Sequence, residues 1–230
     1  MDKITCAIAA CLVVGHFSAA APGTEWPDNW RPLTFANIER GTAYILIRDG
    51  ASTVVKATSD ASASGMIRQI RIDPKAYPVV AWRWRVENVL AHGDPTRKDG
   101  DDYPARLYIT FAYDPARASL IEAAKYRAAR LLFGPDVPFR AVNYIWDRAN
   151  PIDAIVPNPY TDWTQMIVVE SGGERLHQWI AEERNLYDDY RRAFHEEPPM
   201  ITGVAIMTDT DNTRESAVAF YGDIVFKSAR

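Results

Sequence analysis

The chain has 230 residues, of which 47% are hydrophobic and 11% aromatic, so it is long enough to bury one good core or two small ones. Its formal net charge at pH 7 is −4, from 26 basic and 30 acidic residues. The basic residues form no continuous stripe, because acidic residues are interspersed with them. This argues against nucleic-acid binding as the main role.

The first 21 residues differ in character from the rest of the chain. Lys3 precedes an uncharged run, ITCAIAACLVVGHF, and the small residues SAAA follow it. This order is typical of a secretory signal peptide, with cleavage expected near Ala20 or Ala21. The run is shorter than the ~20 residues that a membrane-spanning helix needs, so we expect no transmembrane segment after its removal.

Both cysteines, Cys6 and Cys11, lie in this first segment. We do not expect a lipid anchor at Cys11, because only a few apolar residues precede it. The exported chain would then have no cysteine for a disulfide, a nucleophile or a metal site. We therefore expect a periplasmic or secreted protein that consists of one domain over residues 22–230.

Short apolar segments then alternate with turn signals such as Asp49-Gly50 and Asp73-Pro74. Period-two alternation of apolar and polar residues is typical of strands with one buried face. In the last segment it places Phe220 and Ile224 on the same face. The pattern predicts strands at residues 44–48, 52–58, 65–72, 79–87, 106–111, 143–146, 165–170, 202–208 and 217–226.

Two helices are predicted between these strands. Asp114 can cap a helix, Pro115 can occupy its first position and Gly134 can follow as its stop, so we expect the first helix at residues 115–133. The second is expected at residues 174–194. Residues at helical spacing are expected to face the core. They are Leu120, Ile121, Ala124, Ala128, Leu131 and Leu132 in the first helix, and Leu176, Trp179, Ile180, Tyr187, Tyr190 and Phe194 in the second.

Nine or ten short strands with two inserted helices favour a mainly β fold. An α/β fold would need helices between most strand pairs, and only two helices are evident. The jelly-roll type of antiparallel β-sandwich fits this order best. Because no linker or internal repeat is visible, we expect a single domain.

Long motifs along the chain resemble a family of bacterial proteins. They are WRWRVENVL, GDDYPARLYITF, VPNPYTD, MIVVESG, RNLYDDYRRAF with EPP, and GVAIMTDTDNTRESAVAFYGDI. They resemble the family known as domain of unknown function 3047, from about Trp30 to Phe226. The resemblance implies no activity, substrate or site residues. The closing motif also looks like the end of galactose-binding-like β-sandwiches, which implies a related fold, and such domains often bind glycans and many hold a structural calcium ion.

Two loops concentrate carboxylate and amide oxygens. The first contributes Asp94, Asp99, Asp101 and Asp102, and the second contributes Asp209, Asp211 and Asn212, with Asp223 farther along. Ca²⁺ binds six to eight oxygen ligands, so the first loop is a candidate calcium site. Neither loop follows the EF-hand pattern. The alternative is that these aspartates cap turns and pair with Arg83, Arg85 and Arg106.

A glycan site needs aromatic faces and planar polar groups. Candidates for the polar groups and the rim are Arg83, Arg85, Arg106, Tyr108, Trp146, Tyr160 and Trp163, together with Asp209, Asp211 and Asn212 of the second acidic loop. The alternative is an ordinary charged strand face. Trp82 and Trp84 alternate with Arg83 and Arg85, and we assign both tryptophans to the core.

Catalysis has less support than binding. No Gly-x-Ser-x-Gly motif is present, and the three histidines after residue 21 lack the spacing of zinc ligands. A glycoside hydrolase needs two carboxylates across a cleft, and here the pair would be Asp101 or Asp102 with Asp209 or Asp211.

The sequence therefore predicts an exported, non-catalytic binding protein for a carbohydrate or another polar ligand of the cell envelope, with Ca²⁺ as a candidate cofactor. One alternative is a glycan-acting hydrolase that uses the paired aspartates. Another is an envelope scaffold that holds a protein partner through the basic first helix or exposed tryptophans. The two acidic loops form one site only if the fold brings them together.

Overall fold

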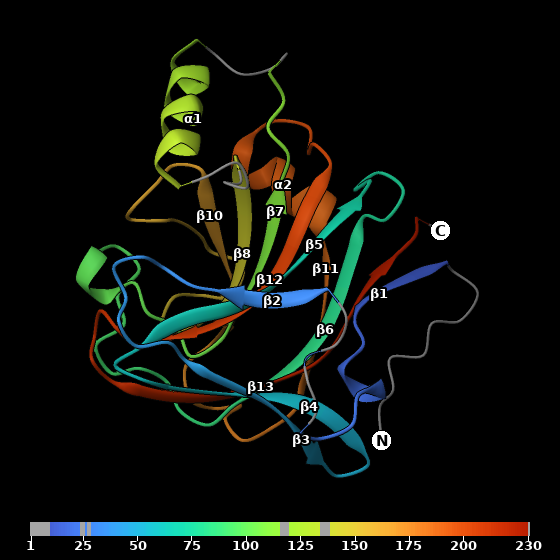
Figure 1. Ribbon diagram of the computed structural model, residues 1–230, viewed down its shortest axis with the longest axis vertical. Coiled ribbons are helices and arrows are strands. Elements are labelled where there is room, and N and C mark those ends of the chain that lie inside the picture. Colours follow the sequence, from blue (N-terminus) through green and yellow to red (C-terminus); the bar gives the residue numbers. More distant parts are fainter. Residues whose placement is uncertain (1–9, 24–25, 27–28, 116–119, 134–138, 230) are drawn as a thin grey trace.

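Two β-sheets lie face to face and make up most of the structure, and two helices lie at their periphery (Figure 1). The computed structural model describes residues 10–23, 26, 29–115, 120–133 and 139–229. Helix α1 (Leu120–Phe133) stands at one end of the sandwich, and α2 (Leu186–Phe194) lies against it. The predicted mainly β fold with two helices is confirmed.

The sheets differ in strand order. Sheet A has the order β11-β6-β13-β4-β3, and β1 also pairs with β13. Its strands are β1 (Cys11–Gly15), β3 (Ala43–Asp49), β4 (Ser52–Asp60), β6 (Val79–Val86), β11 (Ile180–Asn185) and β13 (Ser216–Lys227). Sheet B has the order β2-β5-β12-β7-β8-β10-β9. Its strands are β2 (Trp30–Leu33), β5 (Ala63–Ile72), β7 (Arg106–Phe111), β8 (Arg140–Asp147), β9 (Ile155–Pro157), β10 (Thr164–Ser171) and β12 (Ile201–Asp209). Pairing is antiparallel except between β8 and β10.

Four aromatic rings fill the space between the sheets. Trp82 and Trp84 point inward from β6 and meet Tyr144 and Trp146 from β8, and none of the four is more than 1% exposed. The ring centres of Trp82 and Tyr144 lie 5.1 Å apart, and those of Trp84 and Trp146 lie 6.1 Å apart. Such pairs contribute about 0.5–1.5 kcal/mol each beyond their buried area. The assignment of Trp82 and Trp84 to the core is correct, and Trp146 belongs there with them.

Strand β13 changes its inward face at a β-bulge between Tyr221 and Ile224. Both of these residues belong to the core. Phe220 lies on the outer side of sheet A, where Cζ of Arg85 is 4.0 Å from its ring centre. A bulge inserts an extra residue into one strand and reverses the alternation beyond it. Phe220 and Ile224, which the pattern placed on one face, therefore point to opposite faces.

Strand β1 belongs to the sandwich, although it precedes the expected start of the domain at residue 22. It pairs with the last residues of β13, beyond the end of β4. Phe17, which follows it, is 0% exposed, and its ring centre lies 5.2 Å from that of Trp30. A cleavage near residue 21 would remove both β1 and Phe17 from the fold. The basic start of the expected signal peptide, in residues 1–9, lies outside the described residues.

Among the side chains of helix α1 that the structure describes, Tyr126 and Glu122 contact the rest of the protein, and Glu122 accepts a hydrogen bond from Arg140 at 3.0 Å. The side chains of Leu131 and Leu132 lie outside the described part of the chain. The ring of Tyr126 stacks on Tyr113 at 4.2 Å and meets Phe139 edge-on at 5.7 Å. Leu120 and Ile121 are 91% and 70% exposed. The expectation that these two residues face the core is therefore wrong. Among the described helices, none has the length and apolar character needed to cross a membrane.

The second helix is shorter than predicted, because residues 180–185 form strand β11. This strand pairs antiparallel with β6 along its whole length and buries Ile180. Helix α2 begins after Asn185, whose side-chain oxygen accepts a hydrogen bond from the backbone N–H of Asp188 at 3.2 Å. Pairing with a sheet edge outweighs the helical preference of the alanine, glutamates and arginine before this cap.

Two glutamates from different sheets meet beside Trp84. Glu170 lies in β10 of sheet B, and Glu182 lies in β11 of sheet A. Trp84 Nε1 donates a hydrogen bond to Glu182 Oε1 at 3.3 Å, and Arg175 forms an ion pair with Glu170. Burial and the charge of Glu170 raise the pKa of Glu182 to about 7. One carboxyl group of this pair therefore retains a proton in the folded protein at mildly acidic pH.

The stability contributed by this proton is expected to decrease as the pH rises. The folded state keeps it up to about pH 7, whereas the unfolded chain releases it near the ordinary glutamate pKa of 4.5. The contribution is therefore fully present below pH 4.5 and is lost as the pH rises through 7. Thermal unfolding from pH 4.5 to 8 should show a smaller loss of Tm in Glu182→Gln than in the wild type. Glu183→Gln, at the exposed neighbour, is the control, and a Tm–pH curve of Glu182→Gln identical to that of the wild type would contradict this assignment.

Candidate functional site

The strands β7 and β12 place a buried arginine beside a buried aspartate. Leu107 and Ile109 of β7 point into the core, so Arg106 and Tyr108 point to the outer side of sheet B. Because β7 and β12 are antiparallel neighbours, the start of one lies beside the end of the other. Arg106 begins β7 and Asp209 ends β12.

Arg106 and Asp209 form a bidentate ion pair. Arg106 Nε donates to Asp209 Oδ1 at 2.8 Å, and Nη2 donates to Asp209 Oδ2. Their side chains are 2% and 3% exposed. The same guanidinium donates to the backbone carbonyl of Asp101 and, at 3.0 Å, to the hydroxyl of Tyr108. Its Cζ lies 4.3 Å from the ring centre of Tyr103. One side chain therefore ties β7, β12 and the first acidic loop together.

Asp102 connects the first acidic loop to the second. Its carboxylate accepts hydrogen bonds from the backbone N–H groups of Thr213 at 2.6 Å and Asn212 at 3.3 Å. Asp102, Asp209 and Asp211 each bring a carboxylate oxygen within 4.8 Å of the others. The fold thus brings the two acidic loops into one site. The sequence alone left open whether the two loops meet.

The loop between β9 and β10 adds a rim to this site. Asn158 Nδ2 donates to Asp101 Oδ2 at 3.3 Å. The hydroxyl of Tyr160 donates to the backbone carbonyl of Lys98 at 2.9 Å and accepts from Asn212 Nδ2 at 3.1 Å. The side chain of Tyr160 is nevertheless 54% exposed. Its ring is therefore held in place by its hydroxyl group while much of its surface stays open to solvent.

Burial dominates the titration of this cluster. It raises the pKa of Asp209, and the guanidinium of Arg106 acts in the opposite direction. It also raises the pKa of Asp101, and that of Asp211, where the charge of Asp102 adds to the effect. Burial raises the pKa of Tyr108 to about 12, so its hydroxyl keeps its proton. Burial thus opposes the negative charge of these carboxyl groups, and a positively charged partner such as Arg106 offsets that penalty.

Asn143 is a buried polar residue that the sequence reasoning missed. It lies opposite Tyr108 on β7 and beside Met166 on β10, and it is 0% exposed. Neither atom of its amide has a hydrogen-bond partner among the residues that the structure describes. Buried polar groups nearly always have such partners. The signal in the sequence was one amide within the otherwise apolar strand segment AVNYIW.

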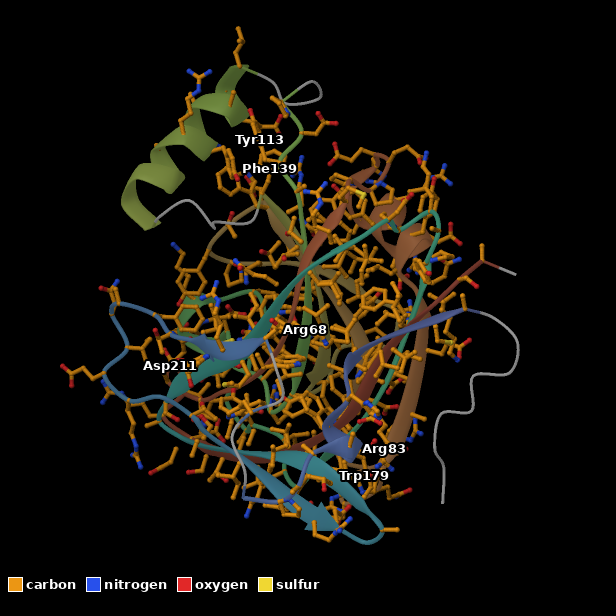
Figure 2. The ribbon with its side chains drawn as sticks, turned by 45° about the vertical axis from the view of Figure 1, so that its right-hand side comes forward. Arg68, Arg83, Tyr113, Phe139, Trp179 and Asp211 are labelled. Carbon is orange, nitrogen blue, oxygen red and sulfur yellow. The ribbon has the colours of Figure 1, made fainter. Side chains whose placement is uncertain are left out.

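Several residues that the sequence grouped with this site lie elsewhere. Arg83 and Arg85 are on the outer side of sheet A, where their Cζ atoms lie 4.6 and 5.4 Å from the ring centre of Trp179. Figure 2 shows Arg83 and Trp179 well apart from Asp211. Strands β6 and β7 belong to different sheets, so their polar faces point in opposite directions. Trp146 is in the core and cannot form a rim.

The structure does not bring the four aspartates of the first loop together as one set of ligands. Asp94 accepts hydrogen bonds from the backbone and hydroxyl of Thr96, and Asp99 pairs with Arg97 at the surface. Within the described chain, only Asp101 and Asp102 of this loop lie beside the pair of Arg106 and Asp209.

A shallow hollow of about 630 Å³ lies beside α2 and not at the two acidic loops. Charged side chains line it, and they are Asp188, Arg191, Arg192, His195, Glu196 and Glu197.

Breaking the buried ion pair is expected to destabilise the protein strongly. Arg106→Met or Asp209→Leu alone should each lower the free energy of unfolding by about 3–5 kcal/mol, because each leaves a buried charge without its partner. The double variant should lose less than the sum of the two single losses. Urea denaturation of the four proteins measures this coupling. Simple addition of the two losses would show that the side chains do not act as a pair.

Comparison with solved structures finds similar two-sheet folds at very low identity. The family 11 carbohydrate-binding module of the cellulosomal cellulase Lic26A-Cel5E of Clostridium thermocellum is 8% identical, with a TM-score of 0.46 over 97% of each chain. The family GH12 endoglucanase 3 of Trichoderma harzianum is 8% identical, with a TM-score of 0.40 over 90% of this chain and 100% of that one. The cellulose-induced protein Cip1 is 12% identical, with a TM-score of 0.34 over 86% and 90%. At these scores, the likenesses carry no argument about activity.

No curated protein matches the sequence. The profile of one protein family, described as protein of unknown function (DUF3047), matches residues 28–225. This range holds the core strands and both acidic loops. The chain therefore belongs to the DUF3047 family.

Proposed function

We propose that the protein is a non-catalytic binding protein for a carbohydrate or a similar polyhydroxylated ligand of the cell envelope. The observation that carries this proposal is the fixed, half-exposed ring of Tyr160 at the edge of the polar cluster. A sugar ring presents an apolar face that packs on an aromatic ring, and hydroxyl groups that bind planar polar side chains. Because the Tyr160 ring is already anchored, little conformational entropy is lost when a ligand packs on it.

Polar groups suited to hydroxyl recognition lie next to this ring. Asn212 donates to the Tyr160 hydroxyl, and Asp211 is half-buried beside it in the second acidic loop. On the same side of sheet B, Asn158 contacts Met166, which neighbours Asn143 on β8. Asn143 itself is 0% exposed, so its unpaired amide lies beneath this rim and is not open to a ligand.

The geometry favours binding over hydrolysis by the paired aspartates. A catalytic carboxyl must come within hydrogen-bond distance of the substrate. Asp102 and Asp209 are each 2% exposed. Loop N–H groups hold the first and Arg106 holds the second. Both carboxylates therefore serve the loop structure, and the hydrolase alternative has no accessible pair at this site.

Replacing Tyr160 is expected to weaken glycan binding selectively. Tyr160→Ala should weaken the affinity for a bound glycan at least about tenfold, which corresponds to about 1.4 kcal/mol, because the stacking surface is lost. Tyr160→Phe keeps the ring and should lose less. Affinity electrophoresis across a panel of polysaccharides, followed by titration calorimetry with the ligands found, measures this. Tyr187→Ala on α2 is the matched control. Failure of the wild type to bind any glycan, or unchanged binding by Tyr160→Ala, would contradict the proposal.

We also propose that the protein is exported, on the basis of the basic start and apolar run of residues 1–21. The protein is therefore expected in the periplasmic or extracellular fraction of the cells that produce it. Fractionation with a cytoplasmic marker enzyme tests this, and co-purification with that marker would contradict it. Sequencing the recovered N-terminus then shows whether the exported chain keeps β1.

A further inference from the structure

We propose that helix α1 docks on the surface of an anionic lipid membrane. The helix stands at one end of the sandwich (Figure 1), and Tyr126 and Glu122 attach it to the rest of the protein. Among the described residues, Leu120 and Ile121 are the most exposed large apolar side chains, at 91% and 70%. This docking is independent of the proposed glycan recognition.

The exposed apolar residues of α1 form one continuous side of the helix. An α-helix turns about 100° per residue, so residues three or four apart lie on the same side. Leu120, Ile121, Ala124 and Ala128 have this spacing, and all four are exposed. Tyr126, which is buried, lies on the opposite side of the helix. The apolar side therefore points away from the sandwich instead of into it.

Two cations border this apolar side. Lys125 follows Ile121 by four residues and Arg127 follows Leu120 by seven, so each lies beside one border of the apolar side. Both are exposed, and neither forms an ion pair with the described residues. Glu122, the acidic residue of α1, lies on the inner side of the helix. The outward surface of the described helix is thus apolar at its centre and positively charged at both borders.

This pattern favours a lipid surface as the occupant. A helix that lies in a membrane interface buries its apolar side at the boundary between headgroups and acyl chains, and its Lys and Arg residues attract anionic lipids. Long basic side chains can reach the headgroups while their stems stay beside the apolar layer. Because the net charge of the chain is −4, attraction to an anionic surface must come from a local basic region, and α1 supplies one.

A second copy of the chain fits this helix less well. A projecting apolar helix needs either a soft apolar layer or a groove of matching shape and chemistry. The hollow beside α2 is lined by charged side chains, so it offers no apolar surface to Leu120 and Ile121. A bilayer needs no preformed groove, because lipid chains rearrange around the inserted side chains.

The contact is expected to be shallow and reversible. Helix α1 has 14 residues, which at 1.5 Å per residue corresponds to a length of about 21 Å. Two large apolar side chains bury less surface than a single acyl chain, whose membrane binding is already marginal. The attraction of Lys125 and Arg127 to anionic headgroups is therefore needed as well. Both the apolar side chains and the cations should contribute measurably.

Flotation of the full chain with lipid vesicles tests this docking. The wild type should float with vesicles made of equal parts phosphatidylglycerol and phosphatidylcholine. It should stay behind with vesicles of phosphatidylcholine alone, because the cations then lack an anionic surface. NaCl at about 1 M, where the screening length falls to about 3 Å, should release most of the bound protein.

Paired substitutions separate the two contributions. Leu120→Gln with Ile121→Gln should lower the partition coefficient at least about tenfold, because the burial of two side chains is lost. Lys125→Gln with Arg127→Gln should lower it by a similar factor on the anionic vesicles. Glutamine keeps a good helical preference, so the Tm should stay that of the wild type. Ile152→Gln, at an isoleucine that is 54% exposed elsewhere on the surface, is the matched control and should float as the wild type does.

The other outcomes would overturn the docking or leave the glycan proposal to stand alone. Failure of the wild type to float with anionic vesicles would overturn it, and so would unchanged flotation of either paired variant. Equal flotation with phosphatidylcholine alone would overturn the role of the cations. Dimers of the wild type that Leu120→Gln with Ile121→Gln disrupts, without flotation, would make α1 a protein interface instead. Tyr160→Ala should float as the wild type does, whatever its effect on glycan binding.

Discussion

The buried pair of Arg106 and Asp209 is the interaction on which the rest of the site depends. It lies at the point where β7 begins and β12 ends, and each partner is nearly inaccessible to water. A buried ion pair of this kind often adds little net stability compared with apolar residues of the same size. Here the ion pair fixes the positions of its neighbours, because the same guanidinium also donates hydrogen bonds to the carbonyl of Asp101 and the hydroxyl of Tyr108. The loops keep their arrangement because one planar cation satisfies several acceptors at once.

The local character of most strands could be predicted, because alternation is a property of each strand by itself. Trp82 and Trp84 were placed in the core correctly, and Arg106 and Tyr108 were placed correctly on the other face of β7. Alternation does not say to which sheet a strand belongs. Arg83 looked equivalent to Arg106 for that reason, although the two lie on opposite outer sides of the sandwich. The meeting of the acidic loops depends on the pairing of β7 with β12, which is a long-range contact without a local signal.

Other differences have equally specific causes. Trp146 was expected at a rim as one of the aromatic side chains on which a sugar could pack, but its strand is central in sheet B and faces the tryptophans of β6. Phe220 and Ile224 were separated by a bulge that no simple period reveals. The site residue with the weakest signal was Asn143, since a single amide in an apolar strand has no pattern around it. In each case the decisive information was the neighbouring strand rather than the residue's own segment.

The charged residues of strand β11 matter because this strand lies at an edge of its sheet. Residues 180–185 were expected in a helix because Ile180 and Tyr187 lie at helical spacing with the residues around them, yet the strand forms the outer edge of sheet A. An edge strand presents unpaired N–H and C=O groups to which another chain can add, and charged side chains there discourage such addition. Glu183 and Arg184 are therefore well placed to keep the sandwich from aggregating edge to edge.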